Sequence, residues 1–353
     1  MHEISTKIKK KNTKLEATLV LSNSATNGII SQNDYFDKDI ANDENIDKYY
    51  VISKGDFVYN PRKSSNAPYG PINILEKYDK GIASPLYTCF SIKTDKQEFL
   101  KYYFKSNKWH RFIYINGDKG ARGDRVSIKD DVFYKMPIMI PTYLESEKLS
   151  NLLSLLERKI TIARSKYETL KKYKKGLIQK LIGKIVFTDY YRLSDVCKID
   201  TGKLDANQMV VDGKYKFFTC SRDDFYINSY AFNCEAILVS GNGDVGFSKY
   251  YKGKFNAYQR TYVLHDFLVN AKYVKIIFDN NVNKIVRKET NIGAMPYIRK
   301  STFDKVLIPK LKKESIEYIV NIYDSLSYKI DTLEAKLSLL KSFWHQLLKD
   351  MFI

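Results

Sequence analysis

The sequence predicts an α+β protein with two mainly-β domains, each followed by a long helix, and the two helices are expected to pair as an antiparallel coiled coil. Three observations lead to this prediction: an internal repeat, a heptad stripe in each copy, and short strand patterns between the stripes. The repeat comes first, because self-similarity at a fixed period decides how the rest is interpreted. Segments 133–182 and 303–352 align without a gap, at an offset of 170 residues.

The repeat divides the chain into four segments. Residues 1–141 and 185–309 carry the strand patterns, and residues 142–184 and 310–353 carry the helical patterns. Short alternating apolar runs such as 51–59 lie between Gly, Asn, Asp and Pro turns, which is typical of strands. We therefore predict two sheet domains, a central helix and a C-terminal helix.

Both helical segments carry an apolar stripe with heptad spacing. Lys174 interrupts the first stripe once. A pattern held over about five heptads is typical of a coiled coil, and about 38 residues would span roughly 57 Å. The simplest partner for each stripe is the other one; packing of each helix on its own domain is the alternative. The stripes consist of Leu149, Leu153, Leu156, Ile160, Ala163, Tyr167, Leu170, Leu177 and Leu181, and of Ile319, Tyr323, Leu326, Ile330, Leu333, Leu337, Leu340, Trp344, Leu347 and Met351.

Composition indicates a polyanionic partner. The 353 residues include 59 basic and 40 acidic ones, for a formal charge of +19, which favours nucleic acid or an anionic membrane surface. A lysine-rich proteome is the plain alternative. The sequence has no apolar run long enough for a membrane span and no signal-peptide pattern at Met1. The four cysteines lack metal-site spacing, so we expect free thiols, no metal and a cytoplasmic location.

The loops of both strand-rich domains carry side chains suited to reading DNA bases. Arginine can bridge guanine O6 and N7, asparagine and glutamine can bridge adenine N6 and N7, and aspartate can accept from cytosine N4. Lysine and backbone N–H groups suit phosphates. For each residue, a solvated loop is the plain alternative. The candidates are Asn60, Arg62, Lys63, Ser64, Asn66, Lys119, Arg122 and Arg125 in the first domain, and Ser221, Arg222, Asp223, Tyr258, Gln259 and Arg260 in the second.

The two domains resemble each other weakly. Residues 21–24 correspond to 219–222, and Gly70 corresponds to Gly246. The spacing between such anchors varies, so the loops differ. A shared scaffold with divergent loops is expected of two domains that read different sequences.

One motif resembles a cofactor site. Residues 241–246 fit G-x-G-x-x-G after an apolar strand, but such a site needs a helix to start there. The following residues indicate another strand or turn, so we predict a tight hairpin. The sequence also lacks an Asn/Asp-Pro-Pro-aromatic methylation motif and a phosphate-binding P-loop, and its histidines are scattered. We therefore predict no catalytic residue and no cofactor in this chain.

The motifs in their order resemble the specificity subunit of type I restriction–modification enzymes. The segments that carry the resemblance are 55–61, 81–87, 170–182, 193–196 and 308–311, and the resemblance extends over nearly the whole chain. The resemblance implies two target recognition domains, 1–141 and 185–309, that each read one half of a bipartite asymmetric DNA target. It implies that the conserved helices set the spacer and dock two modification subunits.

The resemblance also places the chemistry on other chains. The modification subunits would methylate adenine with S-adenosylmethionine, and restriction subunits would add ATP- and Mg-dependent translocation and cleavage. Two alternatives stay open: a stand-alone DNA methyltransferase or nuclease fragment, and a non-specific single-stranded nucleic-acid binder that stacks bases on its Tyr and Phe side chains. Since most of these aromatics alternate within predicted strands, a core role is expected for them.

Overall fold

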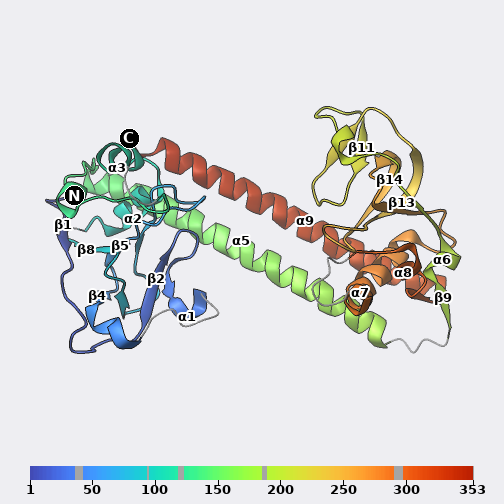
Figure 1. Cartoon of the computed structure of the whole chain (residues 1–353), viewed down its shortest axis with the longest axis horizontal. Coiled ribbons are helices and arrows are strands. Elements are labelled where there is room, and N and C mark those ends of the chain that lie inside the picture. Colours follow the sequence, from blue (N-terminus) through green and yellow to red (C-terminus); the bar gives the residue numbers. More distant parts are fainter. Residues whose placement is uncertain (36–42, 94, 118–122, 185–188, 290–296, 353) are drawn as a thin grey trace. The chain divides into compact units, whose positions relative to one another are not determined.

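The computed structural model describes residues 1–35, 43–93, 95–117, 123–184, 189–289 and 297–352, and it confirms the α+β fold class (Figure 1). The chain forms two compact units. Unit 1 comprises Met1–Ser165 and Glu334–Ile353, and unit 2 comprises Lys166–Leu333. Each unit therefore combines one sheet domain with a part of each long helix. None of the described helices is long and apolar enough to cross a membrane.

Unit 1 contains two four-stranded sheets among its described residues, ordered β1-β8-β5-β6 and β3-β2-β7-β4. β2 and β7 are parallel, and the other paired strands of these sheets are antiparallel. The strands are β1 (Ser5–Lys7), β2 (Val20–Ser24), β3 (Gly28–Ser31), β4 (Tyr50–Ser53), β5 (Phe57–Tyr59), β6 (Ile72–Ile74), β7 (Lys80–Ala83) and β8 (Thr88–Ile92). The helices are α1 (Gln32–Tyr35), a 3-10 turn (Asp43–Lys48), α2 (Gln97–Lys105), α3 (His110–Asn116) and α4 (Asp130–Phe133).

The core of unit 1 is built on aromatic side chains. Phe57 and Phe90 are fully buried and stack with ring centroids 5.5 Å apart, and Tyr59 stacks on Phe133 at 5.2 Å. Trp109 is also buried, and it donates from Nε1 to the Phe104 carbonyl. Burying one large apolar side chain contributes roughly 1.5–3 kcal/mol. These rings therefore serve the core, as the strand alternation predicted.

Unit 2 contains a six-stranded sheet, ordered β10-β15-β13-β14-β11-β12, and the strand pair β16-β9. The helix α7 packs on β13 and β14 and buries Tyr273, Val274, Ile277 and Phe278. The strands are β9 (Tyr190–Arg192), β10 (Lys198–Thr201), β11 (Tyr215–Phe218), β12 (Phe225–Ile227), β13 (Phe232–Ser240), β14 (Ser248–Ala257), β15 (Thr261–His265) and β16 (Leu307–Pro309). The helices are α6 (Leu193–Val196), a 3-10 turn (Ala206–Gln208), α7 (Ala271–Glu289) and α8 (Lys300–Phe303).

The two long helices are α5 (Tyr143–Lys184) and α9 (Lys313–Asp350). A capping box begins α5: Glu145 accepts from the Thr142 N–H at 3.0 Å, and Thr142 Oγ1 accepts from the Glu145 N–H. Every residue of the two heptad stripes named above is buried or half-buried, whereas most other side chains on both helices are exposed. The stripe read from the sequence is thus the face that the fold covers.

Within each unit the helix parts pack in antiparallel order and join the core of the sheet domain. In unit 1, Leu153 near the start of α5 shares a core cluster with Leu348 near the end of α9. In unit 2, Ile178 near the end of α5 shares one with Ile319 near the start of α9. Packing on the sheet domain, the alternative raised from the sequence, therefore occurs at these positions. The four segment boundaries predicted for the domains stay a prediction, because the two units divide both helices.

Lys174 occupies the one polar position of the α5 stripe. Its Nζ donates to Ser327 Oγ at 2.5 Å and lies 3.5 Å from the centre of the Tyr323 ring. Burial, and next the charge of Lys275, lower the pKa of Lys174 to about 8, even though the ring contact favours the charged amine. Lys174 is thus a half-buried ammonium with no carboxylate bound to it among the described residues. Its burial lowers the stability of unit 2.

We expect Lys174→Met to stabilise the protein at pH 7 by about 1 kcal/mol, a value reduced for partial solvent exposure. The folded pKa lies below the ordinary lysine value of 10.5. The unfolded chain therefore binds more protons between about pH 8 and pH 10.5, and wild-type stability rises with pH in that window. The advantage of the variant should shrink as the pH rises through it. Urea unfolding at pH 7 and pH 9.5 measures this, with Lys172→Met on the exposed face as control; equal gains at both pH values would contradict the account.

Candidate nucleic-acid interface

A cleft of about 650 Å³ in unit 1 brings together the described candidate residues of the first domain. Asn60, Arg62, Lys63, Ser64 and Asn66 line it from the loop after β5. Arg125 lines it from a segment sixty residues further along the chain. Backbone bonds join the two segments: Lys63 N–H donates to the Asp124 carbonyl at 2.8 Å, and Val126 N–H donates to the Pro61 carbonyl at 2.9 Å. Lys119 and Arg122 lie outside the described residues.

The cleft is cationic. The described residues that line it include two arginines and one lysine, and they include no aspartate or glutamate. Arg62 and Lys63 are exposed, and Arg125 is half-buried. Asp124 Oδ2 lies 3.8 Å from Arg125 Nε but is not part of the lining. A positive surface of this kind suits a phosphate chain, and the arginine forks suit base edges.

Asn60 already uses its amide within the protein. Its Nδ2 donates to the Asn23 carbonyl at 3.0 Å, and its Oδ1 accepts from the Arg62 N–H at 3.0 Å. Buried Asn23 in turn donates to the Val58 carbonyl, and Asn73 donates to Asn23 Oδ1 at 2.7 Å. This network fixes the start of the loop that carries Arg62. The prediction that Asn60 contacts DNA stays untested, but its geometry supports a positioning role.

Other residues of the cleft were not among the candidates. Ser22 and Ser24 line it from β2, and Leu86 and Tyr87 line it from the turn before β8. The sequence did contain an indication that β2 belongs to the cleft, because residues 21–24 correspond to residues 219–222 beside the candidate loop of the second domain. No comparable signal marked Leu86, an exposed apolar side chain in a polar cleft.

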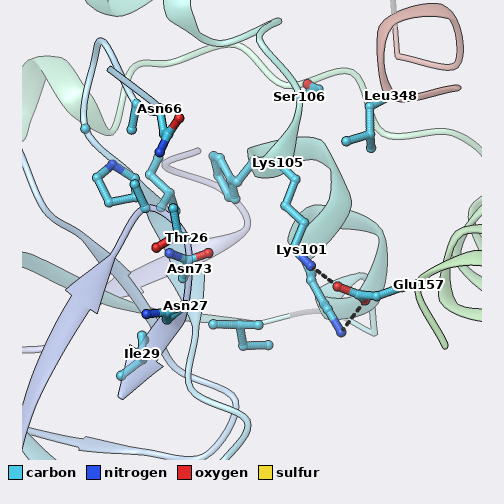
Figure 2. Close-up of a pocket in the computed structure, with 18 of the residues that line it drawn as sticks. Thr26, Asn27, Ile29, Asn66, Asn73, Lys101, Lys105, Ser106, Glu157 and Leu348 are labelled. Atoms are coloured by element: carbon cyan, nitrogen blue, oxygen red, sulfur yellow. Dashed lines mark hydrogen bonds and ion pairs between the residues drawn. The ribbon is translucent and has the colours of Figure 1, made fainter. Parts of the chain in front are cut away.

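A second cavity of unit 1, of about 770 Å³, lies beside the cleft and shares Thr26 and Asn66 with it (Figure 2). Two of its three lysines pair with Glu157 on α5: Lys105 Nζ lies 2.5 Å and Lys101 Nζ 3.6 Å from this carboxylate. Burial alone would raise the pKa of Glu157, but the two ammonium groups lower it. Because Glu76 and Glu157 offset part of the positive charge, this cavity suits an anion less than the cleft does.

In unit 2 the candidate residues lie on loops that meet at one end of the six-stranded sheet. The Arg260 carbonyl accepts from Cys220 Sγ at 3.2 Å, which places the 258–260 turn beside the 221–224 loop. Gln259 donates from Nε2 to Asp205 at 2.9 Å, and Ser221 and Asp223 bond to each other. Arg222 and Arg260 are exposed. These loops are stiffened by their own contacts and present arginine to solvent.

The glycine motif is a hairpin turn, as predicted. β13 and β14 are antiparallel neighbours, and residues 241–247 connect them. Gly243 and Gly246 have φ values of +63° and +79°, which favour glycine. The motif therefore begins a strand where a dinucleotide site would need a helix, and this removes the support it gave to a stand-alone methyltransferase.

Two sheet domains with differing loop surfaces, each built on parts of the same two helices, define a duplicated α+β protein. Residues 188–342 match the family model for the type I restriction modification DNA specificity domain. The type I restriction enzyme EcoDI specificity subunit of Escherichia coli is 37% identical over 145 residues, which cover 41% of this chain and 32% of that protein. The match thus spans about a third of the length of this relative.

Solved structures share the fold. The type I S subunit from M. genitalium aligns with a TM-score of 0.62 at 15% identity, covering 85% of this chain and 83% of that one. A chain from a study of complex assembly and conformational transition of the type I R-M system aligns with a TM-score of 0.55 at 14% identity, covering 98% and 95%. Residues 188–342 thus match a model of the family that the sequence resembles, and the fold is shared with solved structures over most of the chain.

Proposed function

We propose that this chain is the DNA sequence-recognition subunit of a type I restriction–modification complex. Each sheet domain would read one half of a bipartite, asymmetric target in double-stranded DNA. The observation that carries the proposal is the cationic cleft of unit 1, in which Arg62, Lys63 and Arg125 converge and whose described lining residues include no aspartate or glutamate. The loops of unit 2 have a different composition, so the second half-site should differ from the first.

The chemistry would lie on partner chains. We expect two modification subunits with S-adenosylmethionine, and restriction subunits with ATP and Mg²⁺, and we propose no catalytic role for this chain. The helices offer a surface for such partners: outside the buried stripe, α5 exposes Leu152, Leu155 and Ile162, and α9 exposes Leu339 and Phe343. Exposed apolar rows on a helix are typical of protein interfaces.

The helices would also set the spacer between the half-sites. Glu157 and Trp344 meet in one cavity of unit 1, and Lys174 bonds to Ser327 in unit 2. These pairs follow one antiparallel register, with the two residue numbers adding to the same value. A length change that keeps the register must therefore be made in both helices together.

Exchange of the loops in unit 2 tests the proposal. Replacing the segments 203–211, 221–224 and 258–260 by those of another specificity subunit should change one half of the methylated motif and leave the other half unchanged. Methylome sequencing of cells that express the chain with its modification subunits gives the motif. As control, the exposed segment 171–173 of α5 is exchanged in the same way, and both halves should persist. A motif altered in both halves, or in neither, would count against two independent reading domains.

A further inference from the structure

The hairpin turn 241–247 touches the 221–224 loop through one side chain in particular. Arg222 Nε donates to Asp244 Oδ2, and the Arg222 guanidinium lies over the Phe247 ring, with Cζ 4.4 Å from its centre. The turn thus holds the arginine from two sides, by a carboxylate and by an aromatic face. Nη1 and Nη2 have no partner among the described residues, so the outer edge of the fork is left to donate.

The 221–224 loop is itself fastened to the sheet by two lysines. Lys249 Nζ on β14 donates to the carbonyls of Arg222 at 2.6 Å and Asp223 at 3.1 Å. Lys216 on β11 lies 2.9 Å and Lys249 3.2 Å from Asp224. The hydrogen bond from Lys216 keeps the pKa of Asp224 below its ordinary value, against the effect of burial, and Lys249 adds to this. The backbone that carries Arg222 is therefore held in one place.

Stability does not explain the Arg222–Asp244 pair. The Arg222 side chain is 69% exposed and that of Asp244 is 42% exposed. Ion pairs this open to solvent contribute little to folding, because water screens them and their side chains lose rotamer freedom. An acidic group beside a DNA-facing arginine also weakens the attraction of phosphates. The Asp244 carboxylate at this place is explained by its effect on the orientation of the Arg222 side chain.

We propose that Asp244 is a positioning residue that aims the Arg222 fork at a guanine in the second half-site. With Nε held by Asp244, Nη1 and Nη2 form the donor pair that matches guanine O6 and N7 in the major groove. Fixing the side chain before binding lowers the entropy lost when the contact forms. The inference rests on the proposed DNA-recognition function and adds the residue pair and the base that it would read.

The two possible roles of Asp244 predict opposite signs. If Asp244 only neutralises Arg222, Asp244→Asn removes a negative charge near DNA and should tighten binding to every duplex. If Asp244 orients the fork, the same variant should weaken binding to the cognate duplex alone. Asp212→Asn, an exposed aspartate of unit 2, makes the same charge change elsewhere and serves as control.

The experiment uses the full chain assembled with its modification subunits and two duplexes at one salt concentration: the methylated motif and a variant altered in the second half-site. We expect Asp244→Asn to lose about tenfold affinity for the cognate duplex, with unchanged or tighter binding to the altered one. Asp244→Glu, which keeps the carboxylate, should retain part of the affinity. Asp212→Asn should leave the ratio between the two duplexes unchanged.

Replacing each second-half guanine in turn by 7-deazaguanine, which lacks N7, identifies the base. Loss of N7 at one position should lower the affinity of the wild-type complex about tenfold and that of the Arg222→Ala complex little. The proposal is overturned if Asp244→Asn binds the cognate duplex as tightly as wild type or more tightly, or if no second-half guanine couples to Arg222. A wild-type complex that does not distinguish the two duplexes would instead sink the proposed function itself.

Discussion

Replacing Arg62 and Arg125 together by alanine should lower the affinity of the assembled complex for its cognate duplex by roughly 100-fold or more. Both side chains line the unit 1 cleft, whose described lining residues include no carboxylate. A base or phosphate contact from arginine is worth about 1–3 kcal/mol, and the effects of two separate contacts roughly add. The loss should be confined to the first half-site, because the loops of unit 2 are unchanged.

Equilibrium binding to the cognate duplex, and to duplexes altered in one half only, measures this effect. The double variant should no longer respond to changes in the first half-site and should still respond to changes in the second. Arg111→Ala, an exposed arginine on α3 outside the cleft, is the matched control and should behave as wild type. Full discrimination of the first half-site by the double variant would remove the cleft from the recognition surface.

Deleting one heptad from each long helix should shorten the spacer of the methylated motif. Residues 163–169 of α5 and 332–338 of α9 lie at the same level of the antiparallel register and can be removed without shifting the buried stripe. At 1.5 Å per residue the deletion removes about 10 Å, which equals roughly three base pairs. The physical reason is that parts of both helices belong to each unit, so a change in helix length affects both sheet domains.

Methylome sequencing of cells with the shortened chain gives the spacer directly. The half-site sequences should persist, since neither set of loops is altered. Deletion of the heptad from α5 alone is the control, because it puts the stripes out of register and should abolish assembly. A motif with its original spacer would show that the helices do not determine the separation.

Much of the fold could be predicted because periodic patterns of residues in the sequence indicate it. The stripe from Leu149 to Leu181 repeats every three and four residues, and only a helix puts such residues on one face. The hairpin at 241–247 was equally predictable, because Gly243 and Gly246 precede alternating residues where a nucleotide site needs a helix. Both patterns involve residues that are close together in the sequence, so they can be recognised without knowledge of the tertiary contacts.

The helices α2, α3 and α7 were not predicted. α7 contains Val274, Ile276, Ile277 and Val282, whose β-branched side chains favour strands locally. It forms a helix because one face packs on β13 and β14, and tertiary packing overrides weak local propensity. The interpretation of 185–309 as mainly β missed this element for that reason.

The candidate sites divide in the same way. Residue type and loop position were enough to nominate Arg62, Arg125 and Arg222 as candidates, because few side chains can read a base edge. That they contact DNA stays a prediction. That Arg62 and Arg125 face one cleft, that Asn60 fastens the loop, and that Asp244 holds Arg222 were not visible in the sequence.

By itself, then, the sequence determined the duplication, the helix stripes, the resemblance to a known family and the kinds of side chain that the loops carry. The tertiary structure alone decided which of these side chains are exposed to solvent and which make their hydrogen bonds within the protein. The heptads recur at a short, regular spacing and the repeat at a single fixed offset, whereas contacts such as Lys63 with Asp124 or Arg222 with Asp244 join residues whose separation in the chain follows no rule. Only the tertiary fold brings those residues together.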